Sequence, residues 1–347
     1  MSRWSLDIVA SYPRLRALAW AGDVLYASRG YSLLSTTVGA RPIAWSEVAR
    51  YKPPWWRNLT ASTSLTFRLV RDGFHALTRL SSGAMVAAVP GAIVTLPPGG
   101  TEFQATHKIL RGTRPLHICA VPDGTVYFGE YFDNAERDEV HIYASMDHGM
   151  TWQVAHTFPE SAIRHVHNIV YDRWANCLWI LTGDNGDECR VLRASCDLKN
   201  IETVLTGNQQ ARAVAAVPTA EGLYFPSDTP SEANHLYCLD RRQKLHVLAD
   251  IPSSSIYGCR VSDALFFSTM VEPSEVNHED SSWLYGSLGG ATWTRQLSWK
   301  KDRWPFGLFQ YGNALLPDGE NSTGFLAVST VAVTPGDLET SVWRVVR

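Results

Sequence analysis

Hydrophobic residues in this chain come in short runs, most of them bounded by glycine, proline, aspartate or asparagine. The clearest example is Leu116–Val121, which is followed by the turn residues Pro122–Gly124 and a second run from Thr125 to Glu130. The spacing typical of amphipathic helices is scarce. Short runs separated by turn residues are typical of strands, so the sequence predicts an all-β protein.

One phrase of two predicted strands and a turn recurs along the chain. Its starts lie near residues 17, 74, 116, 165, 212, 256 and 306. These starts are spaced about 40–57 residues apart, within the range of propeller blades with four antiparallel strands. The sequence therefore predicts a single β-propeller domain over residues 1–347, with seven blades favoured.

Two features bear on the number of blades and on how the ends of the chain are held. The first repeat is irregular around Tyr51–Trp56, which keeps six blades as the alternative. The C-terminal run Ser341–Arg347 alternates like a strand, and so does Ser5–Ala10. We expect these two segments to pair with each other and to close the ring of blades.

Residues 145–152 read Ser-Met-Asp-His-Gly-Met-Thr-Trp and lie between two strand-like runs. An aspartate that accepts turn amides and a glycine with positive φ suit a hairpin turn. The pattern resembles the Asp box, or BNR repeat, of sialidase-like β-propellers. Its defining positions are Ser145, Asp147, Gly149, Thr151 and Trp152. The resemblance implies a propeller in which this box braces an outer hairpin, and degenerate copies lie at Ser195–Asp197 and Ser287–Trp293.

Composition narrows the class of protein. Hydrophobic residues make up 45% and charged residues 19% of the chain, which favours a folded protein over a disordered one. A net charge of -3 argues against nucleic-acid binding, and no apolar run approaches the length of a membrane span. The first 20 residues lack the apolar run of a signal peptide, and the six cysteines form no C-x-x-C pair. These features predict a cytoplasmic protein, or a secreted one if a leader has been removed.

Superposition of the repeats places polar residues at two recurrent positions, the start of the first strand and the end of the second. The first position holds Arg114 with His117, Arg164 with His167, then Arg212 and Tyr257 in the next two repeats. The second position holds the carboxylates Glu130, Asp184 and Asp228. Both positions face the same channel mouth in a propeller, so we expect one shared polar site there.

The first chemistry that these residues suggest is recognition of an acidic sugar. Arginine binds a carboxylate bidentately, and a neighbouring histidine or tyrosine transfers a proton. The predicted substrate-binding residues are Arg114, Arg164, Arg212, Asp228 and Arg260. The predicted catalytic residues are His117, His167, Glu130 and Tyr257. This set suits a polysaccharide lyase, while a carboxylate pair such as Glu130 with Asp184 suits a glycoside hydrolase.

A divalent metal site is the other chemistry that the same residues suggest. Two imidazoles and a carboxylate are a common ligand set, and the predicted ligands are His117, His167 and Asp184. The expected cofactor is one Mn²⁺, Zn²⁺, Fe²⁺ or Ca²⁺ ion.

The sequence therefore predicts a carbohydrate-active propeller that binds an acidic oligosaccharide, and it leaves open whether a bond is cleaved. The alternative is a non-catalytic scaffold or assembly propeller that binds a protein partner. An exposed apolar patch would favour the scaffold, and a recessed polar funnel would favour the glycan site. Trp55 and Trp56 are predicted to pack between blades, with sugar stacking as their other use. Neither nucleic acid nor a membrane is expected as a partner.

Overall fold

The computed structural model describes residues 4–39 and 43–347. Almost all regular structure in those residues is β-strand, as the sequence predicts. The short helical elements are α1 (Trp55–Thr60), α2 (Ser64–Val70), α3 (Phe306–Phe309) and the 3₁₀ turns η1 (Gly186–Glu188) and η2 (Gln209–Ala211). Within the described ranges, none of these helices is long and apolar enough to cross a membrane.

The chain divides into two compact units. The central unit is His75–Ile251, and the terminal unit combines Met1–Phe74 with Pro252–Arg347. The prediction of one domain over the whole chain stays a prediction.

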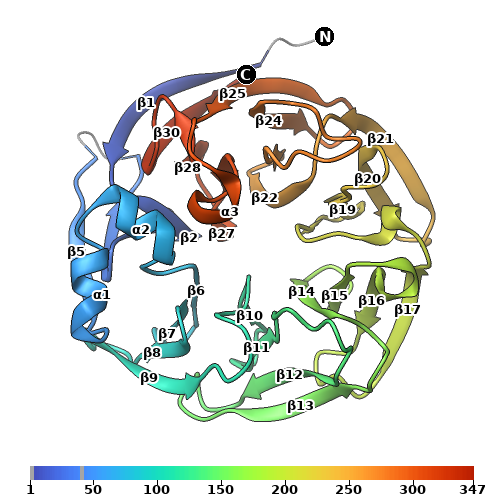
Figure 1. Ribbon diagram of the computed structural model, residues 1–347, viewed down its shortest axis with the longest axis horizontal. Helices are drawn as coiled ribbons and strands as arrows, with labels where there is room; N and C mark the ends of the chain where they lie inside the picture. The colour runs from blue at the N-terminus through green and yellow to red at the C-terminus, as the bar shows by residue number, and fades with distance from the viewer. Residues whose placement is uncertain (1–3, 40–42) are drawn as a thin grey trace. The chain divides into compact units, whose positions relative to one another are not determined.

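The central unit contains four antiparallel meanders, each of four strands paired in chain order (Figure 1). The first meander is β6 (Ala76–Arg79), β7 (Met85–Val89), β8 (Ala92–Leu96) and β9 (Glu102–Lys108). The second is β10 (Cys119–Ala120), β11 (Val126–Gly129), β12 (Val140–Ser145) and β13 (Gln153–Phe158). The third is β14 (His165–Asp172), β15 (Cys177–Gly183), β16 (Arg190–Ala194) and β17 (Ile201–Thr206). The fourth is β18 (Val217–Pro218), β19 (Gly222–Pro226), β20 (Asn234–Asp240) and β21 (Leu245–Ile251).

The terminal unit contains three further four-stranded meanders. One is β2 (Arg16–Gly22), β3 (Val24–Arg29), β4 (Ser32–Thr37) and β5 (Ser46–Tyr51). Another is β22 (Ser255–Val261), β23 (Ala264–Thr269), β24 (Ser281–Leu288) and β25 (Thr294–Lys301). The last is β26 (Asn313–Leu315), β28 (Phe325–Val331), β30 (Glu339–Val346) and β1 (Ser5–Pro13). Two short strands are added, β27 (Asp318–Asn321) parallel to β2 and β29 (Val333–Thr334) beside β25.

The two ends of the chain share a sheet. β1 pairs antiparallel with β30, from Ser5 opposite Val346 to Pro13 opposite Glu339. The predicted pairing of the N-terminal and C-terminal segments is therefore confirmed. The described part of the chain thus holds seven four-stranded antiparallel meanders, which fits the favoured number of blades.

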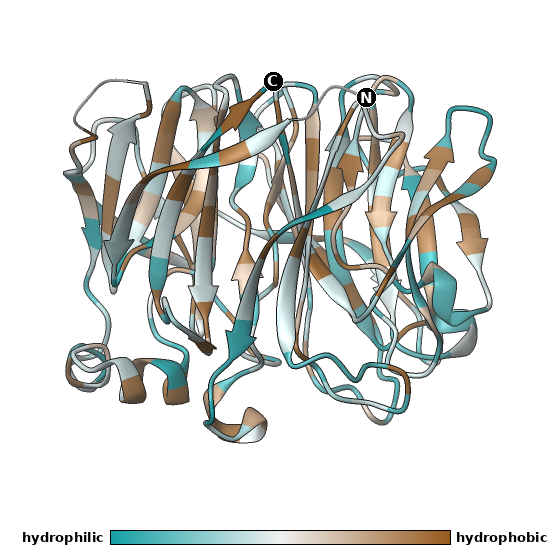
Figure 2. Cartoon of the chain, turned by 90° about the horizontal axis from the view of Figure 1, so that it is seen from above, coloured by the Kyte–Doolittle hydropathy of each residue, from teal (hydrophilic) through white to brown (hydrophobic). Residues whose placement is uncertain are grey.

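The burial of the strands explains the hydrophobic runs in the sequence. All residues of β7, β15 and β19 are buried, whereas the fourth strand β13 is largely exposed. Strands that are covered on both faces read as continuous hydrophobic runs, and half-exposed strands alternate. Figure 2 shows hydrophobic stretches, in brown, along many of the strands. Close packing also restricts side-chain size, because a Cβ on Gly129 would lie 2.4 Å from Cβ of Val166 in the next meander.

The hairpin between β12 and β13 is braced by the residues of the predicted Asp box. Asp147 accepts the backbone N–H of Met150 and Thr151 at 3.1 and 2.8 Å and the Thr151 hydroxyl at 2.6 Å. The Trp152 indole donates to the Gly149 carbonyl at 3.1 Å. The same indole contact recurs in the degenerate box, where Trp293 donates to the Gly290 carbonyl at 3.0 Å. These contacts brace the turn of the hairpin.

Replacement of Asp147 by alanine is expected to lower the free energy of unfolding by about 1 kcal/mol, since an exposed hairpin loses several charge-assisted bonds. Burial would raise the pKa of Asp147, but hydrogen bonds from Thr151, Ser145 and Met150 outweigh it and lower the pKa to about 2. A depressed carboxyl pKa stabilises the fold above its unfolded value and loses that effect on acidification. Urea unfolding at several pH values should show the wild-type advantage shrinking as the pH falls toward 2. Asp123→Ala, which removes one turn bond to Thr125, is the control and should cost less.

Candidate functional site

The first strands β10, β14 and β18 of the central unit are neighbours, with β14 contacting the other two. Polar residues gather where these strands begin and where their hairpin partners end. Arg164 directly precedes β14, Asp184 directly follows β15, Arg212 follows η2, and Asp228 follows β19. We call these four residues, with His165 and His167, the Arg–His–Asp cluster.

Charges of opposite sign alternate through this cluster. Arg164 contacts Asp133 and lies 3.1 Å from Oδ2 of Asp184. Arg212 lies 3.4 Å from Oδ1 of Asp184 and 3.5 Å from Oδ2 of Asp228. Each guanidinium therefore lies between two carboxylates of the protein itself. An arginine that is already paired in this way offers little to the carboxylate of an incoming ligand.

His165 and His167 are the most buried titratable groups of the cluster, with 5% and 3% of their surface exposed. Their Nε2 atoms lie 3.0 Å apart, and Oδ1 of Asp184 lies 3.4 Å from the first and 3.1 Å from the second. Burial lowers the pKa of His167, and Asp184 opposes this only in part. Burial alone would raise the pKa of Asp184, but its neighbours, the cation of Arg212 among them, hold the pKa well below its usual range. Asp184 is therefore an ionised carboxylate between two buried imidazoles.

Tyr131 covers the imidazoles from the second meander. Its ring centroid lies 4.3 Å from that of His165 and 6.2 Å from that of His167. Burial, reinforced by the negative charges of Asp184 and Asp228, raises the pKa of Tyr131 to about 12. Tyr131 is thus a neutral aromatic cover rather than a ready proton donor.

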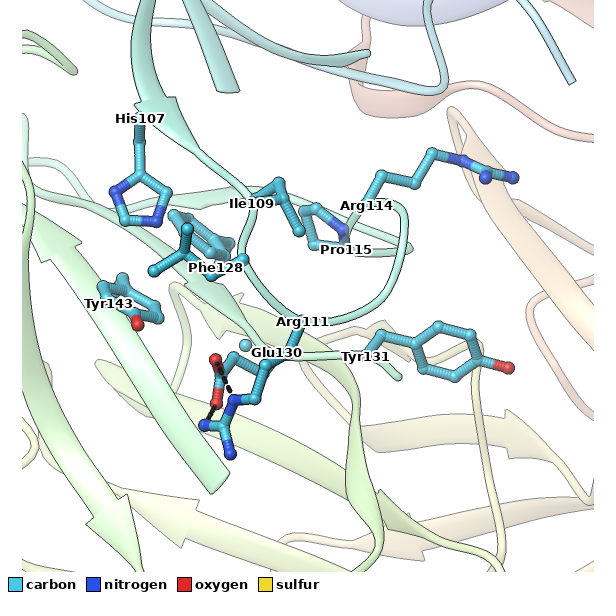
Figure 3. A pocket seen from close by; sticks show the side chains of 11 residues that line it. His107, Ile109, Arg111, Arg114, Pro115, Phe128, Glu130, Tyr131 and Tyr143 are labelled. Atoms are coloured by element: carbon cyan, nitrogen blue, oxygen red, sulfur yellow. Dashed lines mark hydrogen bonds and ion pairs between the residues drawn. The ribbon is translucent and has the colours of Figure 1, made fainter. Parts of the chain in front are cut away.

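Glu130 lies in a neighbouring pocket, which Figure 3 shows with Arg111, Arg114 and Tyr131. Arg111 holds both carboxylate oxygens of Glu130 in a fork, with its Nε 3.0 Å from Oε1. The backbone N–H of His141 donates to Oε2 at 2.9 Å. A carboxylate that accepts these bonds is a structural anion. The Cζ atom of Arg111 also lies 4.6 Å from the centroid of the Phe132 ring.

The structure brings together only part of the predicted site. Arg164, His167, Asp184, Arg212 and Asp228 lie in the Arg–His–Asp cluster, and Arg114 lines the pocket beside it. His117 is partly buried in the loop before β10 and does not belong to the group of potential metal ligands found among the described residues. Tyr257 and Arg260 lie in β22 of the terminal unit. The catalytic and substrate-binding roles assigned to individual residues stay predictions.

His165 is the residue that sequence reasoning missed. The superposition of repeats paired His167 with His117 and left His165 opposite Pro115. The signal was the His-x-His spacing, because alternate residues of a strand share a face. In the group of potential ligands, His165 takes the place that was predicted for His117.

A second surface of interest belongs to the terminal unit, where α1, α2 and α3 carry exposed apolar side chains. Trp55 is 75% exposed, Leu59 63% and Leu308 59%. We call this surface the helical face; its other exposed members are Trp56, Leu65, Leu69, Trp304 and Tyr311. The predicted packing of Trp55 and Trp56 between blades is therefore wrong.

The helical face is held on the unit by buried ion pairs. Arg57 of α1 bonds to the buried Asp72 at 2.7 Å, and Asp72 also accepts the Tyr31 hydroxyl at 2.7 Å. Arg68 of α2 is buried and bonds to Asp302 at 2.5 Å and to Asp337 at 3.1 Å, next to α3. Buried ion pairs thus hold in place the helices that carry the exposed apolar side chains.

No family model matches the sequence. No curated protein matches it either. Solved structures share its architecture at low identity. A chain of the mitotic checkpoint complex is similar over 98% of this chain and 95% of its own, with a TM-score of 0.58 and 11% identity. The WD40 β-propeller domain of Doa1 is similar over 99% and 97%, with a TM-score of 0.59 and 9% identity. The β-propeller domain of Myceliophteria thermophila Cps50 (Swd1) is similar over 98% and 99%, with a TM-score of 0.60 and 9% identity.

The fold is a β-propeller. The all-β, four-stranded antiparallel blades that the sequence predicts are confirmed. The resemblance to propellers is thereby confirmed at the level of the fold, whereas the sialidase-like class finds no support among these structures.

The prediction of a carbohydrate-active protein is wrong. The similar structures named above are a WD40 domain, another β-propeller domain and a chain of a protein complex, and none of them is named as a lyase or a glycoside hydrolase. The geometry supplies a physical reason, because the arginines expected to bind a sugar carboxylate, Arg164 and Arg212, are paired with aspartates of the protein. The predictions of glycan binding, of glycan cleavage and of an acidic carbohydrate partner are therefore wrong as well.

Proposed function

We propose that this protein is a non-catalytic β-propeller that binds a protein partner on its helical face. The observation that carries the proposal is the gathering of large exposed apolar side chains on α1, α2 and α3. Soluble proteins seldom leave such side chains clustered in water unless another molecule covers them. Tryptophan is also the residue type most enriched among those that dominate binding energy. One of the similar chains was solved as part of the mitotic checkpoint complex, a protein assembly, which supports a role in protein binding here.

The charge of the surrounding segment indicates the chemistry of the partner. The exposed cationic side chains of residues 50–71 are Arg50, Lys52 and Arg71, and this stretch contains no aspartate or glutamate. A partner with apolar side chains flanked by acidic ones complements this surface in both respects. We therefore propose an acidic, amphipathic segment of another protein as the ligand.

An anionic membrane is the other ligand that a basic, tryptophan-rich surface suits. Interfacial membrane helices bury a long continuous apolar face, whereas α1 and α2 have only 6 and 7 residues. The short length of these helices favours a protein partner.

The test compares a variant of the helical face, Trp55→Ser with Leu59→Ser, with wild-type protein. Proteins recovered from the native extract with wild-type bait are purified, and their affinity for each form is measured by calorimetry. Loss of two large exposed apolar side chains is expected to weaken binding at least about 30-fold, as for binding hot spots. The matched control is Met146→Ser with Val247→Ser, which removes two exposed apolar side chains of the central unit. The control is expected to bind like wild type, and both variants should keep the wild-type melting temperature.

Equal binding by the helical-face variant would contradict the proposal. So would binding to phosphatidylserine vesicles that depends on Trp55, because it would assign the face to a membrane. Dimers that dissociate in the variant would assign it to a second copy of this chain, again against the proposal.

Two finer assignments accompany this function. The complete box at Ser145–Trp152 supports a relationship to Asp-box propellers, here without their enzymatic activity. All six cysteines are free thiols, and five of them are buried, which supports a reducing compartment such as the cytoplasm.

A further inference from the structure

Three buried ligand atoms converge at one point of the Arg–His–Asp cluster. They are Nε2 of His165, Nε2 of His167 and Oδ1 of Asp184, separated by 3.0, 3.1 and 3.4 Å. Both imidazoles come from β14, and the carboxylate follows its hairpin partner β15. The three ligand atoms are therefore held by a strand hairpin and not by a long loop.

Hydrogen bonds on the far side of each ring determine which nitrogen carries the proton. Nδ1 of His165 lies 3.0 Å from the Phe132 carbonyl, and Nδ1 of His167 lies 2.9 Å from the Ala213 carbonyl. A carbonyl only accepts, so each Nδ1 must donate. In a neutral imidazole the Nε2 atom is then an unprotonated acceptor. Three acceptors, one of them anionic, thus face one another without a donor among them.

We infer that His165, His167 and Asp184 bind a divalent transition-metal ion, with Zn²⁺ as the best fit. Ligand atoms about 2.0–2.2 Å from one zinc ion, at angles of about 90–110°, lie about 2.8–3.6 Å from each other. The three separations in this site fall within that range. Two nitrogen ligands favour Zn²⁺, Fe²⁺ or Mn²⁺ over Ca²⁺, which takes oxygen ligands.

The residues around the three ligands fit a metal site as well. Metal-binding histidines almost always donate their other N–H to a carbonyl or carboxylate, as both do here. Arg164 bonds to Oδ2 of Asp184 at 3.1 Å and leaves Oδ1 directed at the imidazoles. Gly183 is required beside them, because a Cβ there would lie 2.5 Å from Cε1 of His167.

A single proton is the alternative occupant of this position. It would make one imidazole cationic and bond it to the carboxylate, with Arg212 as a second cation 3.4 Å from Oδ1. One proton bridges one pair of atoms well, whereas a metal ion contacts all three. The three nearly equal separations therefore favour the metal, and the proton is an outcome of the test.

The test uses the full-length protein, stripped with a chelator and titrated with Zn²⁺ alone against a chromophoric competitor. One equivalent of Zn²⁺ is expected to bind, and at 100 times Kd it should raise the melting temperature by about 4 °C. His167→Ala and Asp184→Asn are each expected to weaken binding at least about 100-fold, since they remove a ligand. The matched control is His235→Ala, which removes a histidine that pairs with Asp250 outside the cluster and should bind like wild type.

A measurement on the wild-type protein covers the case in which a ligand variant does not fold. Co²⁺ in place of Zn²⁺ is expected to give ligand-field absorption and to shift the imidazole signals of His165 and His167 in NMR spectra. No Zn²⁺ binding, binding that the variants retain, or Co²⁺ signals from other histidines would each overturn the inference. Stabilisation by protons alone, with no effect of Zn²⁺, would assign the position to a shared proton.

Discussion

Replacement of Asp172 by alanine is expected to destabilise the protein by about 3 kcal/mol, because the donors that surround this buried carboxylate lose their acceptor. Asp172 ends β14 and has no exposed surface. Arg241 from the next meander bonds to its two oxygens at 2.5 and 3.2 Å, and the Trp179 indole donates to Oδ2 at 3.0 Å. The backbone N–H groups of Trp174 and Ala175 donate to Oδ1. Denaturant unfolding followed by tryptophan fluorescence measures the loss.

The same carboxylate gives a pH dependence of known sign. Burial would raise the pKa of Asp172, but bonds from Arg241, Trp179 and Ala175 outweigh it and lower the pKa. Its stabilisation is therefore complete above the unfolded value, near 3.8, and is lost as the pH falls through the lower folded value. The difference between wild type and Asp172→Ala should shrink on acidification. Asp197→Ala, at an exposed hairpin, is the matched control; if it cost as much as Asp172→Ala, the buried pair would not be the cause.

Local patterns were enough to predict most of the strands. The run Val166–Asp172 and the run from Cys177 to Asp184 correspond to β14 and β15, because strands buried on both faces must be apolar throughout. Turn residues between such runs marked the hairpins, and the Asp box marked one of them by its hydrogen-bonding chemistry. The pairing of β1 with β30 was predictable because two strand-like ends lacked other partners in the sequence.

The helices escaped prediction for the opposite reason. Trp55, Leu59 and Leu69 are apolar but face solvent, so no core-facing period distinguishes α1 and α2. Apolar residues are usually buried, and the sequence alone does not reveal where that rule fails. The ion pairs of Arg68 could not be predicted either, because its partners Asp302 and Asp337 lie more than 230 residues away along the chain.

The sequence predicted where the candidate site lies, but not which of its arginines and aspartates form ion pairs. The repeats placed Arg164, Asp184 and Arg212 near one another, since blade geometry fixes where strands begin and end. Which charges neutralise which is decided by contacts between blades, such as Arg164 with Asp133. These contacts changed an expected binding surface for a sugar into a cluster whose charges are already satisfied.

Arg68 links the stability of the fold to the proposed function, and its replacement by alanine is expected to cost about 3 kcal/mol. The side chain is buried, bonds to Asp302 and Asp337, and donates through Nε to the Phe309 carbonyl at 3.2 Å. The expected cost lies at the lower end for a buried ion pair because Lys301 still contacts Asp302 after the replacement. Denaturant unfolding measures it. Arg50→Ala is the matched control, since it breaks an exposed pair with Glu47 and should cost at most about 1 kcal/mol.

Measuring partner affinity shows whether Arg68 also fixes the geometry of the helical face, in addition to stabilising the fold. Because Arg68 is buried beneath the helical face, it does not contact a ligand there. Its loss releases α2 from the segment that carries α3, so the two parts of the face no longer share a fixed geometry. We therefore expect Arg68→Ala to weaken partner binding under conditions in which the protein remains folded, with Arg68→Lys intermediate because it keeps the charge but not the fork. Unchanged affinity in folded Arg68→Ala would mean that the partner contacts α1 alone, or lies elsewhere on the propeller.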